Sequence, residues 1–377
     1  MTQIKVDTVQ NAAGTGNPDF ADGLTYAGAA TSTVNLCEYT SSGTEPSNPK
    51  NGSLWYDTAN SKTKIYVNGA WYDVTTVSSA VWYGDRGVFA GGVFSGSSRT
   101  NVMDYFDITS TGNASDFGDL TGSFSHLSGA SDATYGVFIG GHAGASVSND
   151  MSYITFSTAA NATDFGDTSA GYSFPFVGNI SDGTYGLYAG GYIYSTGTIV
   201  NTIEYITIAS TGNTTDFGDM TTDKRRGACF SDATYGVFGG GLISAGTTNI
   251  IDYVTIASPG NATDFGDLTL ATQAFSGASD DTRGLFVGGI DGGSWNTISY
   301  ITIASTGNAT DFGDLSAGRY QHACTSNSTR MVAAGGYVGS VSNSIDYVTI
   351  QTTSNSSDFG DLTLARSDLA GLSGNAS

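Results

Sequence analysis

The chain has 377 residues, of which 53 are Gly, 5 are Pro and 39% are hydrophobic. It can bury a core but is too rich in glycine to be mainly helical, so an all-β protein is expected. Asp and Glu total 34 against 13 Lys and Arg, and the resulting net charge of −21 disfavours nucleic acid as a partner. The three cysteines, Cys37, Cys229 and Cys324, are too scattered for a disulfide framework or a zinc site, so they are predicted to be reduced packing residues.

Three segments follow one another along the chain. Residues 1–50 are polar, lack an apolar targeting segment and end in a Pro-containing stretch, which predicts an attachment segment and linker. Residues 51–76 alternate apolar and polar side chains around turn-like positions, which predicts a small β-hairpin or meander. Residues 77–377 contain repeats. No stretch of about 18 apolar residues occurs, so membrane insertion is not expected, and the chain is expected to be synthesised in a cytoplasm.

Three markers recur six times in residues 77–377. The tetrapeptide Asp-Phe-Gly-Asp recurs every 47 to 52 residues, beginning at Asp116, Asp164, Asp216, Asp264, Asp311 and Asp358. A tyrosine precedes each of its phenylalanines by 12 residues, at Tyr105, Tyr153, Tyr205, Tyr253, Tyr300 and Tyr347. A Gly-Gly pair precedes each tyrosine, beginning at Gly91, Gly140, Gly190, Gly240, Gly288 and Gly335. The unit therefore has three fixed points.

Each unit is predicted to hold four antiparallel strands. In one unit they lie around 227–230, 235–241, 249–256 and 264–268, with a turn at 258–263. Four-stranded units of this length, repeated six times, predict a six-bladed β-propeller, and a solenoid is the competing architecture. The order of glycine pair, tyrosine and bulky aromatic resembles the kelch repeat, with Phe where that family has Trp. Residues 365–373 are predicted to close the ring beside 86–92, with 79–83 as the rival.

The first 75 residues resemble a known family of proteins. The start MTQIKVDTVQNAAGTG, together with GSLWYDT and KIYVNGAWYDV, resembles the N-terminal parts of tail-fibre and other virion structural proteins of marine, especially cyanobacterial, bacteriophages. That resemblance implies a component of a phage tail or fibre that docks on other virion proteins, forms a homo-oligomer and can recognise the host surface.

Catalysis is not expected. Six copies of Asp-Phe-Gly do not make a kinase, because no His-Arg-Asp loop accompanies them. The Gly-x-Ser-x-Gly elbow is absent, and nothing in the pattern points to a Ser-His-Asp triad. No cofactor is expected, and calcium at the repeated aspartates is the alternative to turn capping. The repeated Asn-x-Ser/Thr is interpreted as capping of the turn before Asp-Phe-Gly-Asp.

The loops of antiparallel units emerge on two faces. One face carries loops that are nearly identical between units and is predicted to be structural. The other carries the segments after Gly-Gly and after Asp-Phe-Gly-Asp, which vary and are rich in aromatic residues and arginine. This face is predicted to recognise a host polysaccharide or a neighbouring virion protein, although loops also vary because they are free to do so. The candidate residues are Tyr172, Tyr192, Tyr194, Arg225, Arg226, Trp295, Arg319, Tyr320, His322 and Tyr337.

Overall fold

The computed structural model describes residues 39–47, 49, 53–58, 62–67, 70–73, 83–144 and 146–376. The chain divides into two compact units, Met1–Ser79 and Ala80–Ser377. The described residues form β-strands and one short 3-10 helix, η1 (Ser95–Ser97), and include no α-helix, which confirms the all-β class. Among the described residues, no helix is long and apolar enough to cross a membrane.

The first unit contains a four-stranded sheet in the order β1 (Tyr39–Ser42), β2 (Leu54–Asp57), β3 (Lys62–Val67) and β4 (Ala70–Asp73). Strands β2 to β4 form the antiparallel meander predicted for residues 51–76. Strand β1 adds in parallel to β2, so the sheet begins inside the segment predicted to be a linker. The buried Trp55 indole favours this pairing, because it donates a hydrogen bond to the Ser42 carbonyl at 3.0 Å. Residues 1–38 of the predicted attachment segment lie outside the described residues.

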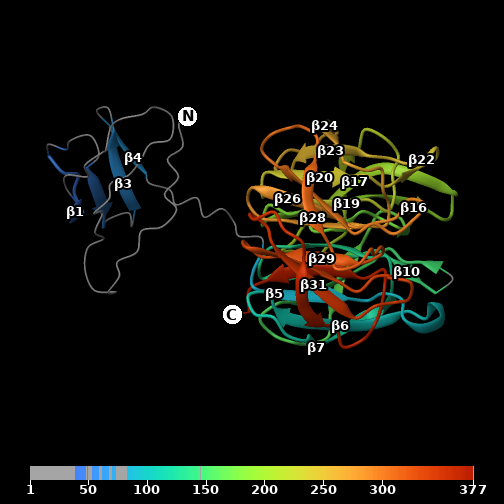
Figure 1. The fold of residues 1–377 in the computed structure, drawn as a ribbon. Helices are drawn as coiled ribbons and strands as arrows, with labels where there is room; N and C mark the ends of the chain where they lie inside the picture. The colour runs from blue at the N-terminus through green and yellow to red at the C-terminus, as the bar shows by residue number, and fades with distance from the viewer. Residues whose placement is uncertain are drawn as a thin grey trace. The chain divides into compact units, whose positions relative to one another are not determined.

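The second unit contains six larger sheets, numbered here in chain order (Figure 1). Sheet 1 is β33 (Ala370–Gly374), β5 (Arg86–Ala90), β6 (Thr100–Asp107) and β7 (Ser115–Phe124). Sheet 2 is β8 (Ser128–Ser131), β9 (Tyr135–Ile139), β12 (Asp150–Thr155) and β13 (Thr163–Asp167). Sheet 3 is β14 (Tyr172–Ser173), β16 (Tyr185–Ile193), β17 (Thr198–Thr207) and β18 (Thr215–Asp219).

The remaining sheets follow the same pattern. Sheet 4 is β19 (Ala228–Ser231), β20 (Tyr235–Gly239), β23 (Ile250–Thr255) and β24 (Thr263–Asp267), with β15 (Val177–Gly178) added in parallel to β19. Sheet 5 is β25 (Ser276–Ser279), β26 (Arg283–Val287), β27 (Thr297–Thr302) and β28 (Thr310–Asp314). Sheet 6 is β29 (Ala323–Ser326), β30 (Arg330–Ala334), β31 (Ser344–Thr349) and β32 (Ser357–Asp361). Two hairpins, β10 (His142–Ala143) with β11 (Ser146–Val147) and β21 (Leu242–Ile243) with β22 (Gly246–Thr247), extend from sheets 2 and 4.

The repeated tyrosine and phenylalanine form one aromatic pair in every sheet. Tyr105 and Phe117, for example, have ring centres 5.8 Å apart and planes at 76°, the edge-to-face geometry that aromatic quadrupoles favour. The other five pairs have nearly the same geometry. Each phenylalanine is buried, so the constant 12-residue spacing reflects one packing contact that joins the last two strands of a sheet.

The apolar core consists of six clusters, and each lies between two consecutive sheets. One cluster joins Phe117 of sheet 1 to Phe138 of sheet 2, and the next four join sheets 2 to 6 in order. The sixth joins sheet 6 back to sheet 1, where Phe359 meets Phe106 with ring centres 5.3 Å apart. The packing of the six sheets is therefore cyclic.

Buried serines join the first strands of sheets 1, 6, 5 and 4 and continue to Ser181, which bridges Gly186 of sheet 3. The Ser373 hydroxyl donates to the Ser326 carbonyl at 2.6 Å, Ser326 donates to Ser279, Ser279 to Ser231, and Ser231 to Ser181. Strand β33 also pairs with β5, which confirms that the C-terminal segment takes the place beside Arg86–Ala90; residues 79–82 of the rival segment lie outside the described residues. In Figure 1 the C-terminus lies next to β5.

The Asp-Phe-Gly-Asp motif also joins neighbouring sheets. Its glycine has φ between +137° and +149° in all six copies, a region that side chains rarely adopt. At Gly360 an added Cβ would lie 2.3 Å from the Gly112 carbonyl oxygen, so the two backbones approach too closely for any side chain. The Asn113 side chain accepts a hydrogen bond from the Asp361 N–H at 3.1 Å. The repeated asparagines therefore bond to the motif of the preceding repeat, which corrects the interpretation that they cap their own turn.

Cys229 and Cys324 are buried free thiols, as predicted. Burial raises the pKa of Cys324 to about 12, so this side chain is an unreactive packing group at neutral pH. Cys37 lies outside the described residues.

Candidate recognition site

The variable segments meet at one end of the six sheets, which we call the loop end. The segment after each Gly-Gly pair bridges the segment that follows an Asp-Phe-Gly-Asp motif, as in the pairs Ser125 with His142, Gln273 with Ile290 and Tyr320 with Tyr337. The prediction that these two kinds of loop share one face is therefore confirmed.

Residues at the opposite end of the sheets make contacts that stabilise turns and join neighbouring sheets. The Arg86 guanidinium stacks over the Tyr105 ring at 5.0 Å and donates to the Phe156 carbonyl of sheet 2 at 2.6 Å. Arg283 and Arg330 stack on the equivalent tyrosines and bond to carbonyls of the next sheet. Turn aspartates at this end bond to backbone N–H groups two and three residues further on. Such repeated contacts are consistent with the predicted structural role of this end.

Six residues at the loop end, which we call the ring residues, each lie nine positions after the phenylalanine of a motif. They are His126, Phe174, Arg226, Ala274, Gln321 and Asp368. All six have φ between +55° and +59° without being glycine. The N–H groups of His126, Arg226, Ala274, Gln321 and Asp368 each donate at 2.7 to 2.8 Å to the carbonyl of the preceding ring residue. Side chains from six distant parts of the sequence are thereby brought together.

Two positions before each ring residue lies a side chain that packs between two sheets. Arg366 there forms an ion pair with Asp104 at 2.8 Å, Arg319 with Asp346 at 3.2 Å and Lys224 with Asp252 at 2.7 Å, and all six side chains are almost fully buried. One repeat before Lys224 and Asp252, the same two positions hold Tyr172 and Glu204, joined by a hydrogen bond of 2.8 Å.

Three candidate recognition residues are therefore corrected. Tyr172 and Arg319 are 3% and 1% exposed, since they bond the buried carboxylates of Glu204 and Asp346 instead of facing solvent. His322 is 1% exposed, and burial and the nearby Arg319 lower its pKa to about 3. All three side chains are buried and are not available at the surface.

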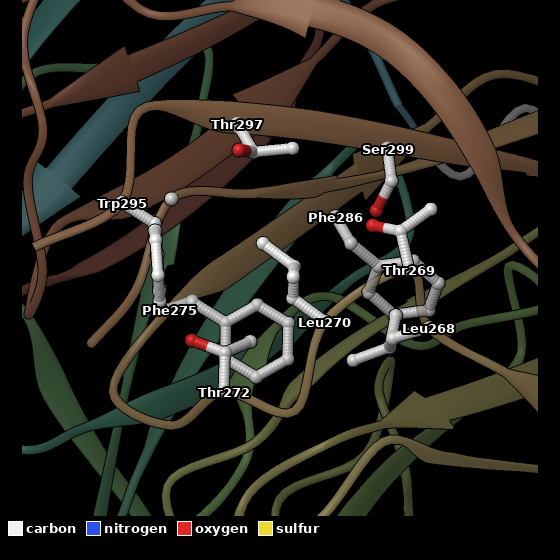
Figure 2. A pocket seen from close by; sticks show the side chains of 10 residues that line it. Leu268, Thr269, Leu270, Thr272, Phe275, Phe286, Trp295, Thr297 and Ser299 are labelled. Carbon is white, nitrogen blue, oxygen red and sulfur yellow. The ribbon is translucent and has the colours of Figure 1, made fainter. Parts of the chain in front are cut away.

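Two interfaces lack such a charged or hydrogen-bonded pair: one has Phe124 and Ser152 at these positions, and the other, which has Thr272 and Ser299, contains a small pocket (Figure 2). Thr272 and Ser299 stand where three other interfaces have a cation and an aspartate, and both line this pocket. Trp295, another candidate, is partly buried along the same wall, near Thr272 and Phe275 in the view of Figure 2. The pocket follows from two short side chains that leave the interface incompletely filled.

The structure brings four of the ten candidates together beside the ring. The Arg226 guanidinium stacks 4.1 Å above the Phe174 ring, and Arg225 lies 4.9 Å from the Tyr192 ring. Tyr192 and Tyr194 have ring centres 5.1 Å apart, and Tyr194 is 49% exposed. We call Phe174, Tyr192, Tyr194, Arg225 and Arg226 the basic–aromatic cluster. Tyr320 and Tyr337 form a separate aromatic pair at 5.3 Å.

Two histidines extend this cluster. The His126 ring meets Phe174 edge-on at 4.3 Å, and its Nε2 lies 2.9 Å from a carboxylate oxygen of Asp368. His142 packs against Tyr194 at 5.1 Å, and its Nδ1 lies 3.1 Å from Arg99 Nη2 and 3.2 Å from the Gly144 carbonyl oxygen. Burial and the charge of Arg99 lower the pKa of His142, so the ring is neutral at pH 7.

Ser125, His126 and Asp368 form a hydrogen-bonded series with the residue types of a hydrolytic triad. The Ser125 hydroxyl lies 3.0 Å from His126 Nδ1, and Arg99 Nε also donates to it at 3.1 Å. Ser125 is fully buried, so in this arrangement its oxygen cannot reach a substrate.

Sequence reasoning missed His126, His142 and Asp368 as parts of the site. His126 and Asp368 could have been found by aligning all six repeats on the motif phenylalanine, because both then occupy the ring position. His142 carried no comparable signal.

Comparison with protein-family models and with curated proteins gives no match for this chain. Within the described ranges, no group of three or more His, Cys, Asp or Glu side chains is placed to hold a metal ion.

Proposed function

We propose that the chain is a non-enzymatic component of a bacteriophage tail or tail fibre. Its six repeats close into a six-bladed, kelch-like β-propeller, and the loop end of this propeller recognises a saccharide on the host surface. The N-terminal segment docks on other virion proteins, and the chain acts as a homo-oligomer in the particle.

The cyclic packing of the sheets supports the propeller, because the sixth core cluster joins sheet 6 to sheet 1. One observation carries the recognition function. The loop end gathers arginines and aromatic rings from different repeats into one partly exposed cluster, whereas the opposite end repeats the same structural contacts in successive sheets. Aromatic and arginine side chains are those that dominate binding surfaces.

Binding of the full chain to an array of bacterial surface polysaccharides tests this function. The wild type is expected to bind at least one polysaccharide, and a Tyr194→Ala/Arg225→Ala variant is expected to lose that binding. Val338, which is 37% exposed at the same end, provides a control variant, Val338→Ala, that retains it. Absence of binding to every polysaccharide and to intact host cells would contradict the proposal.

A structural protein that only packs within the particle is the alternative. Immunogold labelling with an antibody against the loop end distinguishes the two on intact particles. An adhesin exposes this end at the tail or fibre tip, whereas a packing protein buries it against its neighbours.

A glycan-cleaving or other hydrolytic enzyme is the second alternative, and the Ser125–His126–Asp368 series is the observation that favours it. Release of reducing sugar from a bound polysaccharide, or covalent labelling of Ser125 by a fluorophosphonate, would establish such an activity. We expect neither, because Ser125 is buried and its oxygen accepts a hydrogen bond from Arg99.

A further inference from the structure

The cationic side chains of the second unit fall into three groups. Residues 80–377 contain nine Lys and Arg residues. Three of them, Arg86, Arg283 and Arg330, stack on tyrosines and bond to carbonyls of the next sheet. Three more, Lys224, Arg319 and Arg366, form buried ion pairs. The remaining three, Arg99, Arg225 and Arg226, all lie in or beside the basic–aromatic cluster.

Arg225 and Arg226 are incompletely compensated. Their Nε atoms are buried without a hydrogen-bond partner, as are those of Arg319 and Arg366, but among the described residues no ion pair or hydrogen bond joins Arg225 or Arg226 to a carboxylate. Asp368 partly offsets the charge of Arg226 and raises its pKa against the effect of burial, but this carboxylate also pairs with His126. Guanidinium groups stay protonated in proteins, and burying them without an anion is costly. The site therefore holds positive charge that an incoming anion would neutralise.

The surroundings of the two arginines favour a saccharide as the carrier of that anion. Tyr194 is half-exposed beside Tyr192, whose ring lies under the Arg225 guanidinium. A half-exposed aromatic ring offers a flat apolar surface for the C–H face of a sugar, and a guanidinium binds carboxylate, sulfate or phosphate oxygens with two parallel hydrogen bonds.

We infer that the basic–aromatic cluster binds an acidic saccharide, with its anionic group on Arg225 and Arg226 and its sugar ring on Tyr194. This inference rests on the proposed recognition function and specifies the ligand. Because the chain has a net charge of −21, non-specific attraction of a polyanion to the rest of its surface is unfavourable. Binding of an acidic saccharide can therefore be distinguished from non-specific attraction.

Isothermal titration of the full chain tests the inference with four probes: oligogalacturonate, dextran sulfate, neutral dextran and inorganic phosphate. Binding of either acidic saccharide, weakened by salt, with no binding of neutral dextran, is expected. The Arg225→Gln/Arg226→Gln variant should weaken it at least about tenfold, because two charge-assisted contacts are lost. Val338→Ala is the control, and circular dichroism checks that each variant is folded.

Asp368→Asn gives a test that does not depend on a loss of binding. Removing the competing carboxylate should tighten binding of the acidic probe about fivefold to tenfold. The inference is overturned if neutral and acidic probes bind equally, if neither acidic saccharide binds, or if phosphate alone accounts for the binding. In each case the recognition function survives when the array still shows a polysaccharide ligand, so the two failures are distinguishable.

Discussion

The Arg366 guanidinium lies 2.8 Å from the Asp104 carboxylate, and this buried ion pair joins sheet 6 to sheet 1 across 262 residues of sequence. Arg366 also donates to the Phe89 carbonyl, and Thr363 donates to Asp104. The contact therefore closes the cycle of sheets with charges that water cannot reach.

Loss of one partner should be more damaging than loss of both. Arg366→Leu leaves the Asp104 carboxylate buried and unpaired, at an expected cost of about 3 to 5 kcal/mol in the free energy of unfolding. Adding Asp104→Leu should recover most of that loss. Urea unfolding of the two variants measures the difference, and equal stability of the single and double variants would show that the pair does not couple the sheets.

The interface of Thr272 and Ser299 offers the reverse experiment. The background is Trp295→Ser, because Ser342 occupies the equivalent position in the repeat whose interface has the Arg319–Asp346 pair. In this background, Thr272→Arg should destabilise the protein because it buries a guanidinium opposite Ser299. Ser299→Asp should then restore stability, with a coupling of about 1 to 3 kcal/mol. Thermal unfolding of the four members of the cycle measures this coupling. Additive effects would show that positions 272 and 299 are not equivalent to the cation and aspartate positions of the other interfaces.

Gly360 and Gly260 allow the same substitution to be compared at a crowded position and at an open one. Gly360→Ala places a Cβ against the Gly112 carbonyl at a φ of +149° and should cost about 2 kcal/mol or more. A Cβ on Gly260 meets only open space, so Gly260→Ala should remain within about 0.5 kcal/mol of the wild type. Chemical denaturation of both variants compares them, and similar stabilities would argue against the tight approach of neighbouring repeats.

His322 should make stability depend on pH. Its folded-state pKa is about 3, below the ordinary value of about 6.5 for an unfolded chain, so the unfolded state binds the extra proton in this interval. Above pH 6.5 this group does not change the free energy of unfolding with pH. As the pH falls from 6.5 toward 3, the free energy of unfolding decreases by up to about 1.4 kcal/mol per pH unit. His322→Leu should flatten this part of the profile relative to Val338→Ala, and parallel profiles would refute it.

The fold was predictable to the level of its strands because each marker of the repeat has one structural cause. The tyrosine and phenylalanine spacing reflects an edge-to-face pair, and the match between 365–373 and the first strands of other repeats identified the closing strand. The burial of Arg319 and Tyr172 was not predictable from loop composition, because both reach carboxylates that precede the tyrosine of the next repeat. Such contacts between repeats appear in sequence only when two positions are compared across all six copies.

The basic–aromatic cluster could likewise be predicted only in part from the sequence. Tyr192, Tyr194, Arg225 and Arg226 were recognisable from their residue types, but Asp368 and His126 join them only through the ring. The charge balance of the site therefore depends on how the repeats are arranged in space.

Recognition in this account depends on six repeats that close around one axis, since only then do His126, Phe174, Arg226 and Asp368 meet. Electron cryomicroscopy of the full chain tests that closure directly. Projections along the axis should show six radial densities around one centre. Five or seven densities, or a linear row, would contradict the closed arrangement and the recognition site built on it.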